Sequence, residues 1–170
     1  IADFFYRNIN KHNIEIEVKA ILASEASAFD LPDDMSNTLI IAIAQSGTTK
    51  DTNTFIQMAK KRNASTISLL NKRNGDISNL VDETIYIGDG RDIEIAVPST
   101  KTYVAHLVLG YILSLYFIEK FKNKKNIIFP ELKVLKQLPY FLNKFISNYK
   151  KLNLEKVYEW FLTNKNWYIF

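Results

Sequence analysis

Cysteine is absent from the 170 residues of this chain, and histidine occurs only twice. Without cysteine the chain can form no disulfide, no thiolate metal site and no cysteine nucleophile, and the absence fits a cytoplasmic location. His106 lies in an apolar run, where a hydrogen-bonded core residue is a simpler interpretation than a catalytic base. The pairs of loop carboxylates lack a third ligand, so we expect no metal and no cofactor: Asp33 with Asp34, and Asp89 with Asp92.

Signal peptides of the charged, apolar and small-residue kind are also missing. The apolar run TYVAHLVLGYILSLYFI (Thr102 to Ile118) is 17 residues long, at the lower limit for crossing a membrane, and it contains His106 and Gly110. A helix that is apolar on most faces is equally typical of one that covers a sheet in a protein core. We therefore expect no membrane span.

The net charge of +4 is concentrated near the C-terminus. From Glu119 to Lys151 there are nine lysines, two glutamates and no arginine. Such a stripe can bind nucleic acid or an anionic membrane, but arginine is the better partner for phosphates and bases. We expect a solvated helical surface and no direct contact with nucleic acid.

Hydrophobic periodicity predicts strands that alternate with helices after an opening amphipathic helix. The expected strands are Ile14–Ile21, Thr38–Ile43, Ser65–Leu70 and Thr84–Gly88. The expected helices are Asp51–Arg62, a short one near Ile77–Val81, and a long one from about Thr100 to Lys122. This alternation predicts an α/β fold, a flavodoxin-like three-layer α/β/α sandwich with a parallel sheet.

The pattern changes to helices alone after Pro130, up to a final stretch NWYIF that reads as a buried strand. The first residue already lies inside a helix pattern, so both ends look cut. We expect an α/β domain over residues 1–125, and linker helices with the first strand of a further domain over residues 126–170. The aromatic residues of this last third, Trp160 and Trp167 among them, are expected to pack against that further domain.

A polar turn, AQSGTTKDT, follows the strand that ends near Ala44. In a parallel sheet, ligands bind at the carboxyl ends of strands. Gly47 permits a tight turn, the amides that open the next helix suit an anion, and the neighbouring side chains add donors. None of these groups is an acid or base, so the turn is suited to holding a phosphate monoester. Simple helix capping by Ser and Thr is the alternative, and the patterns of a P-loop or a GxGxxG fingerprint are missing.

A second polar turn, DGRDIEIAVPSTKTY, precedes the long helix. Ser99, Thr100 and Lys101 stand where that helix begins, so this loop also offers hydroxyls and amides. Ser99 or Thr100 as a plain N-cap is the alternative. Lys101 is unfavourable at a helix N-terminus, which weakly suggests a reason other than helix stability.

Together the two turns resemble the SIS (sugar isomerase) domain family, and within it the isomerase half of glutamine–fructose-6-phosphate aminotransferases. AQSGTTKDT resembles the family's S-Q-S-G-E-T-x-D-T loop, and EIAVPSTK resembles its E-I-G-V-A-S-T-K segment. ILASEASAF also resembles its A-S-E-F turn, and the similarity runs from about Tyr6 to Leu115. Two motifs about fifty residues apart are more specific than either alone.

The resemblance implies a binding role for both loops and a hexose phosphate, fructose 6-phosphate or glucosamine 6-phosphate, as ligand. The phosphate site would comprise Gln45, Ser46, Gly47, Thr48 and Thr49, of which Gln45, Ser46 and Thr49 match the family's gripping positions. The sugar site would comprise Val97, Ser99, Thr100 and Lys101, of which Val97 and Ser99 match positions that touch the sugar.

The chain departs from the family pattern in several places. Ala44 removes a hydroxyl, Thr48 replaces a glutamate, and Pro98 stiffens the second loop. The family's first strand should lie before Ile1. Its second SIS domain, which supplies the catalytic groups, and its glutamine-hydrolysing domain are missing as well. We therefore expect no catalytic residue here and no autonomous activity, although the full-length parent would convert fructose 6-phosphate and glutamine to glucosamine 6-phosphate and glutamate.

Two other functions stay open at this stage. One is a non-catalytic module that senses a sugar phosphate, and the other is a ketose–aldose phosphate isomerase without amidotransfer. SIS domains usually pair, so the expected macromolecular partners are a second SIS domain, in the same or another chain, and a further copy of this chain.

Overall fold

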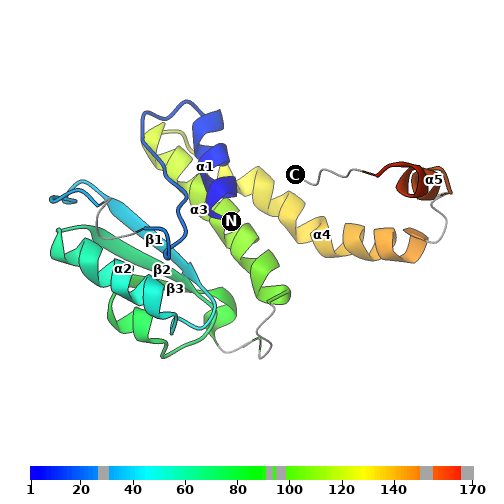
Figure 1. Ribbon diagram of the computed structural model, residues 1–170. Coiled ribbons are helices and arrows are strands. Elements are labelled where there is room, and N and C mark those ends of the chain that lie inside the picture. Colours follow the sequence, from blue (N-terminus) through cyan, green and yellow to red (C-terminus); the bar gives the residue numbers. More distant parts are fainter. Residues whose placement is uncertain (27–30, 91–93, 95–98, 150–154, 166–170) are drawn as a thin grey trace. The chain divides into compact units, whose positions relative to one another are not determined.

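The structure, a computed structural model, describes residues 1–26, 31–90, 94, 99–149 and 155–165 (Figure 1). The chain divides into two compact units, Ile1–Ile128 and Phe129–Phe170. The first contains the sheet and both polar turns.

Three parallel strands form the sheet of the first unit: β1 (Leu39–Ala44), β2 (Ser65–Leu70) and β3 (Glu83–Tyr86). They stand in the order β1-β2-β3. The register pairs Ala44 with Leu70 and Leu70 with Tyr86, so all three strands end at one edge. Parallel neighbours need a crossover between them, and helices supply it here.

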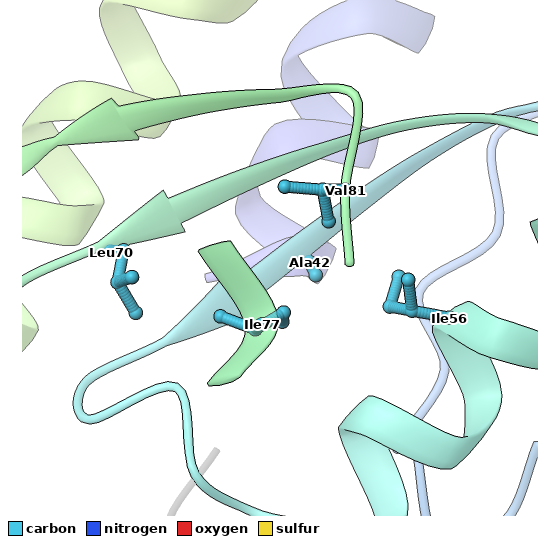
Figure 2. Packing of buried hydrophobic residues seen from close by; sticks show 5 residues of the cluster. All are labelled: Ala42, Ile56, Leu70, Ile77 and Val81. Atoms are coloured by element: carbon cyan, nitrogen blue, oxygen red, sulfur yellow. The ribbon is translucent and has the colours of Figure 1, made fainter. Parts of the chain in front are cut away.

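Helix α2 (Lys50–Lys61) and the 3₁₀ helix η2 (Asp76–Asn79) cover one face of this sheet. The core on this side is a cluster of buried apolar side chains from both helices, two strands and the turn before β3 (Figure 2): Ala42, Ile56, Leu70, Ile77 and Val81. Because Leu70 and Ile77 also lie beneath the turn after β1, this core supports the candidate site directly.

Helix α3 (Lys101–Phe121) lies on the other side of the sheet, together with α1 (Ala2–Lys11) (Figure 1). Ile9 of α1 packs with Leu115 and Ile118 of α3. The His106 ring of α3 lies against β2, with Nε2 3.1 Å from the Leu69 carbonyl oxygen. The unit is therefore a three-layer α/β/α sandwich, as its sequence predicts.

By its length and composition, helix α3 could cross a membrane. Within the protein, 28% of its most apolar stretch is buried. It also carries buried polar side chains with partners on neighbouring elements. Thr102 donates to Asn71, and Ser114 accepts a hydrogen bond from Asn8. Such contacts are typical of a helix that packs in a protein core.

The predicted strand Ile14–Ile21 is wrong, because this segment pairs with no strand among the described residues. Its side chains do alternate between half-buried and exposed, and Ile14 and Val18 pack against the cluster of α1 and α3. A strand needs a neighbour to accept its hydrogen bonds, and β1 is paired only with β2 in the described sheet. Alternation alone cannot supply that neighbour.

The second unit contains two helices, α4 (Ile128–Asn148), which starts at the last residue of the first unit, and α5 (Glu155–Thr163). Several of its large apolar side chains are exposed, including Phe141, Phe145 and Trp160. The predicted last strand, NWYIF, and Trp167 lie outside the described residues.

Candidate functional site

The first polar turn lies where β1 ends and α2 begins. Gly47 has a φ angle of +71°, a left-handed conformation that only glycine adopts without strain. A Cβ atom on Gly47 would lie 2.6 Å from Ile77 Cγ2 and 3.0 Å from Leu70 Cδ1. The turn therefore needs glycine for both its backbone conformation and its close packing.

A neighbouring segment, Lys72–Ile77, holds the main chain of this turn in place. Its amides donate to two carbonyl oxygens of the turn: Lys72 N to Gln45 O at 3.1 Å, and Ile77 N to Gly47 O at 3.0 Å. With these two carbonyls bonded to the neighbouring segment, the turn is fixed from one side.

The hydroxyl groups of the turn lie close together. Ser46 Oγ and Thr48 Oγ1 are 2.9 Å apart, within hydrogen-bonding distance, and Ser46 Oγ also accepts from the Thr48 amide at 3.3 Å. Thr49 occupies the N-cap position of α2, but its side chain makes no capping hydrogen bond. The capping alternative for this turn therefore fails at Thr49.

In the second polar loop, the described residues 99–102 gather around Glu94, which the sequence alone did not single out. The Glu94 carboxylate accepts from the amides of Thr100, Lys101 and Thr102 at 2.8, 3.1 and 2.9 Å. It also accepts from the hydroxyls of Ser99 and Thr100 at 3.0 and 2.8 Å. These hydrogen bonds, those of the Thr100 and Thr102 amides first, lower the pKa of Glu94 far below its ordinary value.

This arrangement also explains the lysine at the start of α3. Thr100 stands at the N-cap position, yet neither its side chain nor that of Ser99 caps the helix, because Glu94 does so in their place. The carboxylate puts a negative charge at the helix N-terminus, which offsets the unfavourable position of Lys101.

The two loops meet through Gln45. Its side-chain amide donates to the Glu94 carbonyl oxygen at 2.9 Å. Asn71 follows the last residue of β2. Its side-chain oxygen Oδ1 accepts two hydrogen bonds, from the Glu94 amide and from the Thr102 hydroxyl, both at 3.3 Å. Residues that follow β1 and β2 are thus joined to the start of α3.

His106 lies below this junction and is buried, with only 3% of its surface exposed. Its Nδ1 is 3.0 Å from the Thr102 carbonyl oxygen and its Nε2 is 3.1 Å from that of Leu69. Burial lowers the pKa of the His106 ring, and the hydrogen bonds to these carbonyls oppose that shift only in part. The ring lies between α3 and β2, as expected for a core histidine; in its neutral form it donates to one of the two carbonyl oxygens.

Of the residues predicted to bind a ligand, those at the first turn lie together at the end of β1: Gln45, Ser46, Gly47, Thr48 and Thr49. At the second loop, Ser99, Thr100 and Lys101 gather around Glu94, while Val97 and Pro98 lie outside the described residues. In the part of the chain that the structure describes, no group of three His, Asp or Glu side chains is arranged to hold a metal ion.

The segment that carries both loops also matches a known family. A sequence profile of the SIS domain matches residues 11–116, more than half of the chain. The chain belongs to the SIS domain family. The match spans the whole sheet and most of α3, so this SIS domain includes both polar loops.

Curated relatives of the SIS domain carry the name glutamine–fructose-6-phosphate aminotransferase (isomerizing). One from Methanococcus maripaludis is 36% identical over 169 residues, which is 98% of this chain and 25% of the relative. One from Clostridium tetani is 40% identical over 116 residues, 66% of this chain and 19% of the relative. The chain thus spans about a quarter or less of these relatives.

Solved structures agree on the fold of this SIS domain protein. The C-terminal domain of glucosamine-fructose-6-phosphate aminotransferase from Francisella tularensis matches with a TM-score of 0.73 at 24% identity, over 96% of this chain and 45% of that one. Glucosamine-6-phosphate deaminase from Thermotoga maritima matches with a TM-score of 0.63 at 22% identity, over 91% and 44%. At these identities the likeness establishes the flavodoxin-like fold alone.

Proposed function

We propose that this chain is the sugar-phosphate-binding part of an enzyme of the glutamine–fructose-6-phosphate aminotransferase type. The observation that carries the proposal is the turn Gln45–Thr49, which places clustered hydroxyls and the amides of a helix N-terminus at the carboxyl end of a parallel strand. The names of the relatives support the reaction of the parent protein. There, fructose 6-phosphate and glutamine would give glucosamine 6-phosphate and glutamate.

The chemistry of the first turn is that of a holder for a phosphate. Hydroxyls and main-chain amides donate to phosphate oxygens, and each charge-assisted hydrogen bond contributes about 1 to 3 kcal/mol. Ser46, Thr48 and Thr49 carry no group that abstracts or delivers a proton at neutral pH. His106 is buried and bonded to carbonyl oxygens, so it is unsuited to meet a substrate. The turn would fix the sugar in place while groups elsewhere in the parent protein react with it.

We further propose that this chain pairs with a second SIS domain. Residues 1–125 would be one SIS domain, and residues 126–170 a helical link to a second SIS domain, supplied by the same or another chain. The exposed aromatic residues of α4 and α5 support such a packing role, because large exposed apolar patches usually mark an interface. A further copy of this chain is proposed as a second partner, and the cytoplasm as the location.

Titration calorimetry of the 170-residue chain with four compounds tests the binding role: fructose 6-phosphate, glucosamine 6-phosphate, fructose and inorganic phosphate. We expect the two sugar phosphates to bind and fructose not to bind. A ligand at about 100 times its Kd also stabilises the fold by about 2.7 kcal/mol, so the melting temperature provides a second measure.

Matched variants locate the site. Ser46→Ala and Thr49→Val should each weaken binding of the sugar phosphates about tenfold, since each removes one donor to a charged oxygen. Two control variants remove a hydroxyl elsewhere and should bind like the wild type. They are Ser65→Ala, at the amino-terminal end of β2, and Thr163→Val on α5. If all four variants bind alike, the turn is not the phosphate site.

A further inference from the structure

Three parts of the fold converge on a single residue, Glu94. Gln45 follows β1, Asn71 follows β2, and Thr100–Thr102 open α3. Each of them has a hydrogen bond to Glu94: Gln45 to its carbonyl, Asn71 to its amide, and the start of α3 to its carboxylate. The main chain of Glu94 therefore bonds residues that follow β1 and β2, and its side chain bonds the start of α3.

The carboxylate of Glu94 closes the N-terminus of α3. Its two oxygens accept from three main-chain amides and two hydroxyls within 3.1 Å, so these five donors at the helix end are already used. A bound negative charge also disfavours a second anion beside it. The phosphate of a ligand is thereby directed to the turn at α2 and away from α3.

The main chain of Glu94 reaches that turn through one residue. Gln45 Nε2 donates to Glu94 O, and Gln45 O accepts from the Lys72 amide beneath the turn. A Glu94 that is fixed by α3 therefore fixes the side chain of Gln45, and Gln45 begins the turn Gln45–Thr49. The path consists of two hydrogen bonds joined by one residue.

We propose that Glu94 is a positioning residue, which fastens the second loop to α3 and through Gln45 sets the geometry of the phosphate turn. For its ligand this inference rests on the proposed function. The coupling between the two loops is independent of any ligand, and it is what distinguishes the role of Glu94 from that of a simple helix cap.

Amide hydrogen exchange of the 170-residue chain, followed by NMR without ligand, tests the coupling. Glu94→Gln keeps the length of the side chain but turns one acceptor into a donor that faces main-chain amides. We expect exchange to accelerate about tenfold or more at Thr102, whose amide donates to the Glu94 carboxylate, and also at Lys72, whose amide donates to Gln45 O. The Ser65 amide donates to Thr38 O at the amino-terminal end of the strands, and its exchange rate should stay unchanged.

The control variant is Glu83→Gln, which removes an exposed carboxylate from β3 and should change none of these rates. Faster exchange at Thr102 with an unchanged rate at Lys72 would reduce Glu94 to a helix cap and overturn the proposal. Unchanged rates at both amides would overturn it as well.

If Glu94→Gln fails to fold, a second variant tests the same coupling by changing Gln45. Gln45→Leu removes the donor to Glu94 O and leaves the carboxylate untouched. Faster exchange at Thr102 in this variant supports the coupling, and an unchanged rate contradicts it.

Titration with fructose 6-phosphate separates this inference from the proposed function. We expect Glu94→Gln to bind about tenfold more weakly than the wild type, and Glu83→Gln to bind like the wild type. Wild-type protein that binds no sugar phosphate would contradict the proposed function, whereas the exchange rates would still decide the role of Glu94. Equal affinity of the wild type and Glu94→Gln would contradict the positioning role alone.

Discussion

Gly75 lies so close to the main chain of Ser46 that a Cβ atom added to it would be 2.3 Å from the Ser46 carbonyl oxygen. The same atom would lie 3.1 Å from Gly47 Cα. Gly75 itself has φ −71° and ψ 149°, angles that any residue adopts. This glycine is therefore required by the closeness of two main-chain segments and not by its own conformation.

Gly75→Ala is expected to destabilise the protein by about 1 to 3 kcal/mol, the usual cost of forcing an extra carbon into a packed site. Urea unfolding measures the change. The clash falls on the backbone of the turn Gln45–Thr49, the proposed phosphate site, so binding of fructose 6-phosphate should weaken too.

Gly110→Ala in α3 is the matched control. There the new Cβ atom would make an ordinary contact at 3.7 Å to Ile1, and alanine is the better helix former by up to about 1 kcal/mol. We expect this variant to be as stable as the wild type or more so. A Gly75→Ala protein that is equally stable would show that the two segments separate easily.

Stability at acid pH should depend on Asp82, which precedes β3. Its carboxylate bonds Lys60 at 2.8 Å and accepts from both the amide and the hydroxyl of Thr66, which lowers the pKa of Asp82 from 3.8 to about 2. A carboxyl with a lowered pKa stabilises the fold above its ordinary pKa, and this contribution is lost as the pH falls from about 4 to about 2.

Asp82→Asn should therefore be less stable than the wild type at neutral pH, and the difference should shrink as the pH falls to about 2. Urea unfolding at several pH values measures it. The exposed pair with Lys60 contributes little by itself, so most of the loss should come from Thr66. For Glu83→Gln, the difference in stability from the wild type should not shrink in this way. A difference for Asp82→Asn that stays constant with pH would show that Asp82 is not the group responsible.

The sequence predicts those parts of the fold that depend on neighbours along the chain. Strand β1 and helix α2 could be predicted because an apolar run, a glycine and a helical period follow one another in one short stretch. The position of the turn between them, at the end of β1, could be predicted for the same reason, and its role as a ligand site stays a prediction. The residues that support this turn come from elsewhere in the chain, and no comparable local pattern marks Gly75 as one of them.

Contacts between distant residues could not be predicted in this way. Gln45 and Glu94 are 49 positions apart, and no local pattern shows that one donates to the other. The one available signal was Lys101 at a helix start, where its charge is unfavourable unless an acidic group lies nearby. The strand prediction for Ile14–Ile21 failed for a related reason, since its alternation is real but it pairs with no strand among the described residues.

His106 should make the protein less stable as the pH falls below neutrality. Burial lowers the pKa of the ring from 6.5, so the unfolded chain takes up a proton more readily than the folded one. Stability from this group is then complete above about pH 6.5 and is lost as the pH falls toward the pKa of the folded state.

His106→Leu should remove this part of the pH dependence. At pH 8 the variant should also be less stable by about 1 to 3 kcal/mol, because a carbonyl oxygen of Thr102 or Leu69 loses its donor. Thermal unfolding across this pH range measures both effects. His12→Gln, at the end of α1, is the control and should keep the wild-type pH dependence. If His106→Leu keeps it as well, another group is responsible.

Self-association should depend on the aromatic side chains of α4. Phe141 and Phe145 are 52% and 61% exposed within the described part of the chain, and they lie four residues apart, on one face of the helix. Burying such side chains contributes about 1.5 to 3 kcal/mol each, so the loss of both from each copy should weaken association measurably. Replacing both with Asp should shift the protein toward the monomer in sedimentation equilibrium. Asn143→Asp adds a charge to the same helix without removing an apolar group, and this variant should associate like the wild type. If it dissociates equally, charge repulsion and not the loss of aromatic contacts explains the effect.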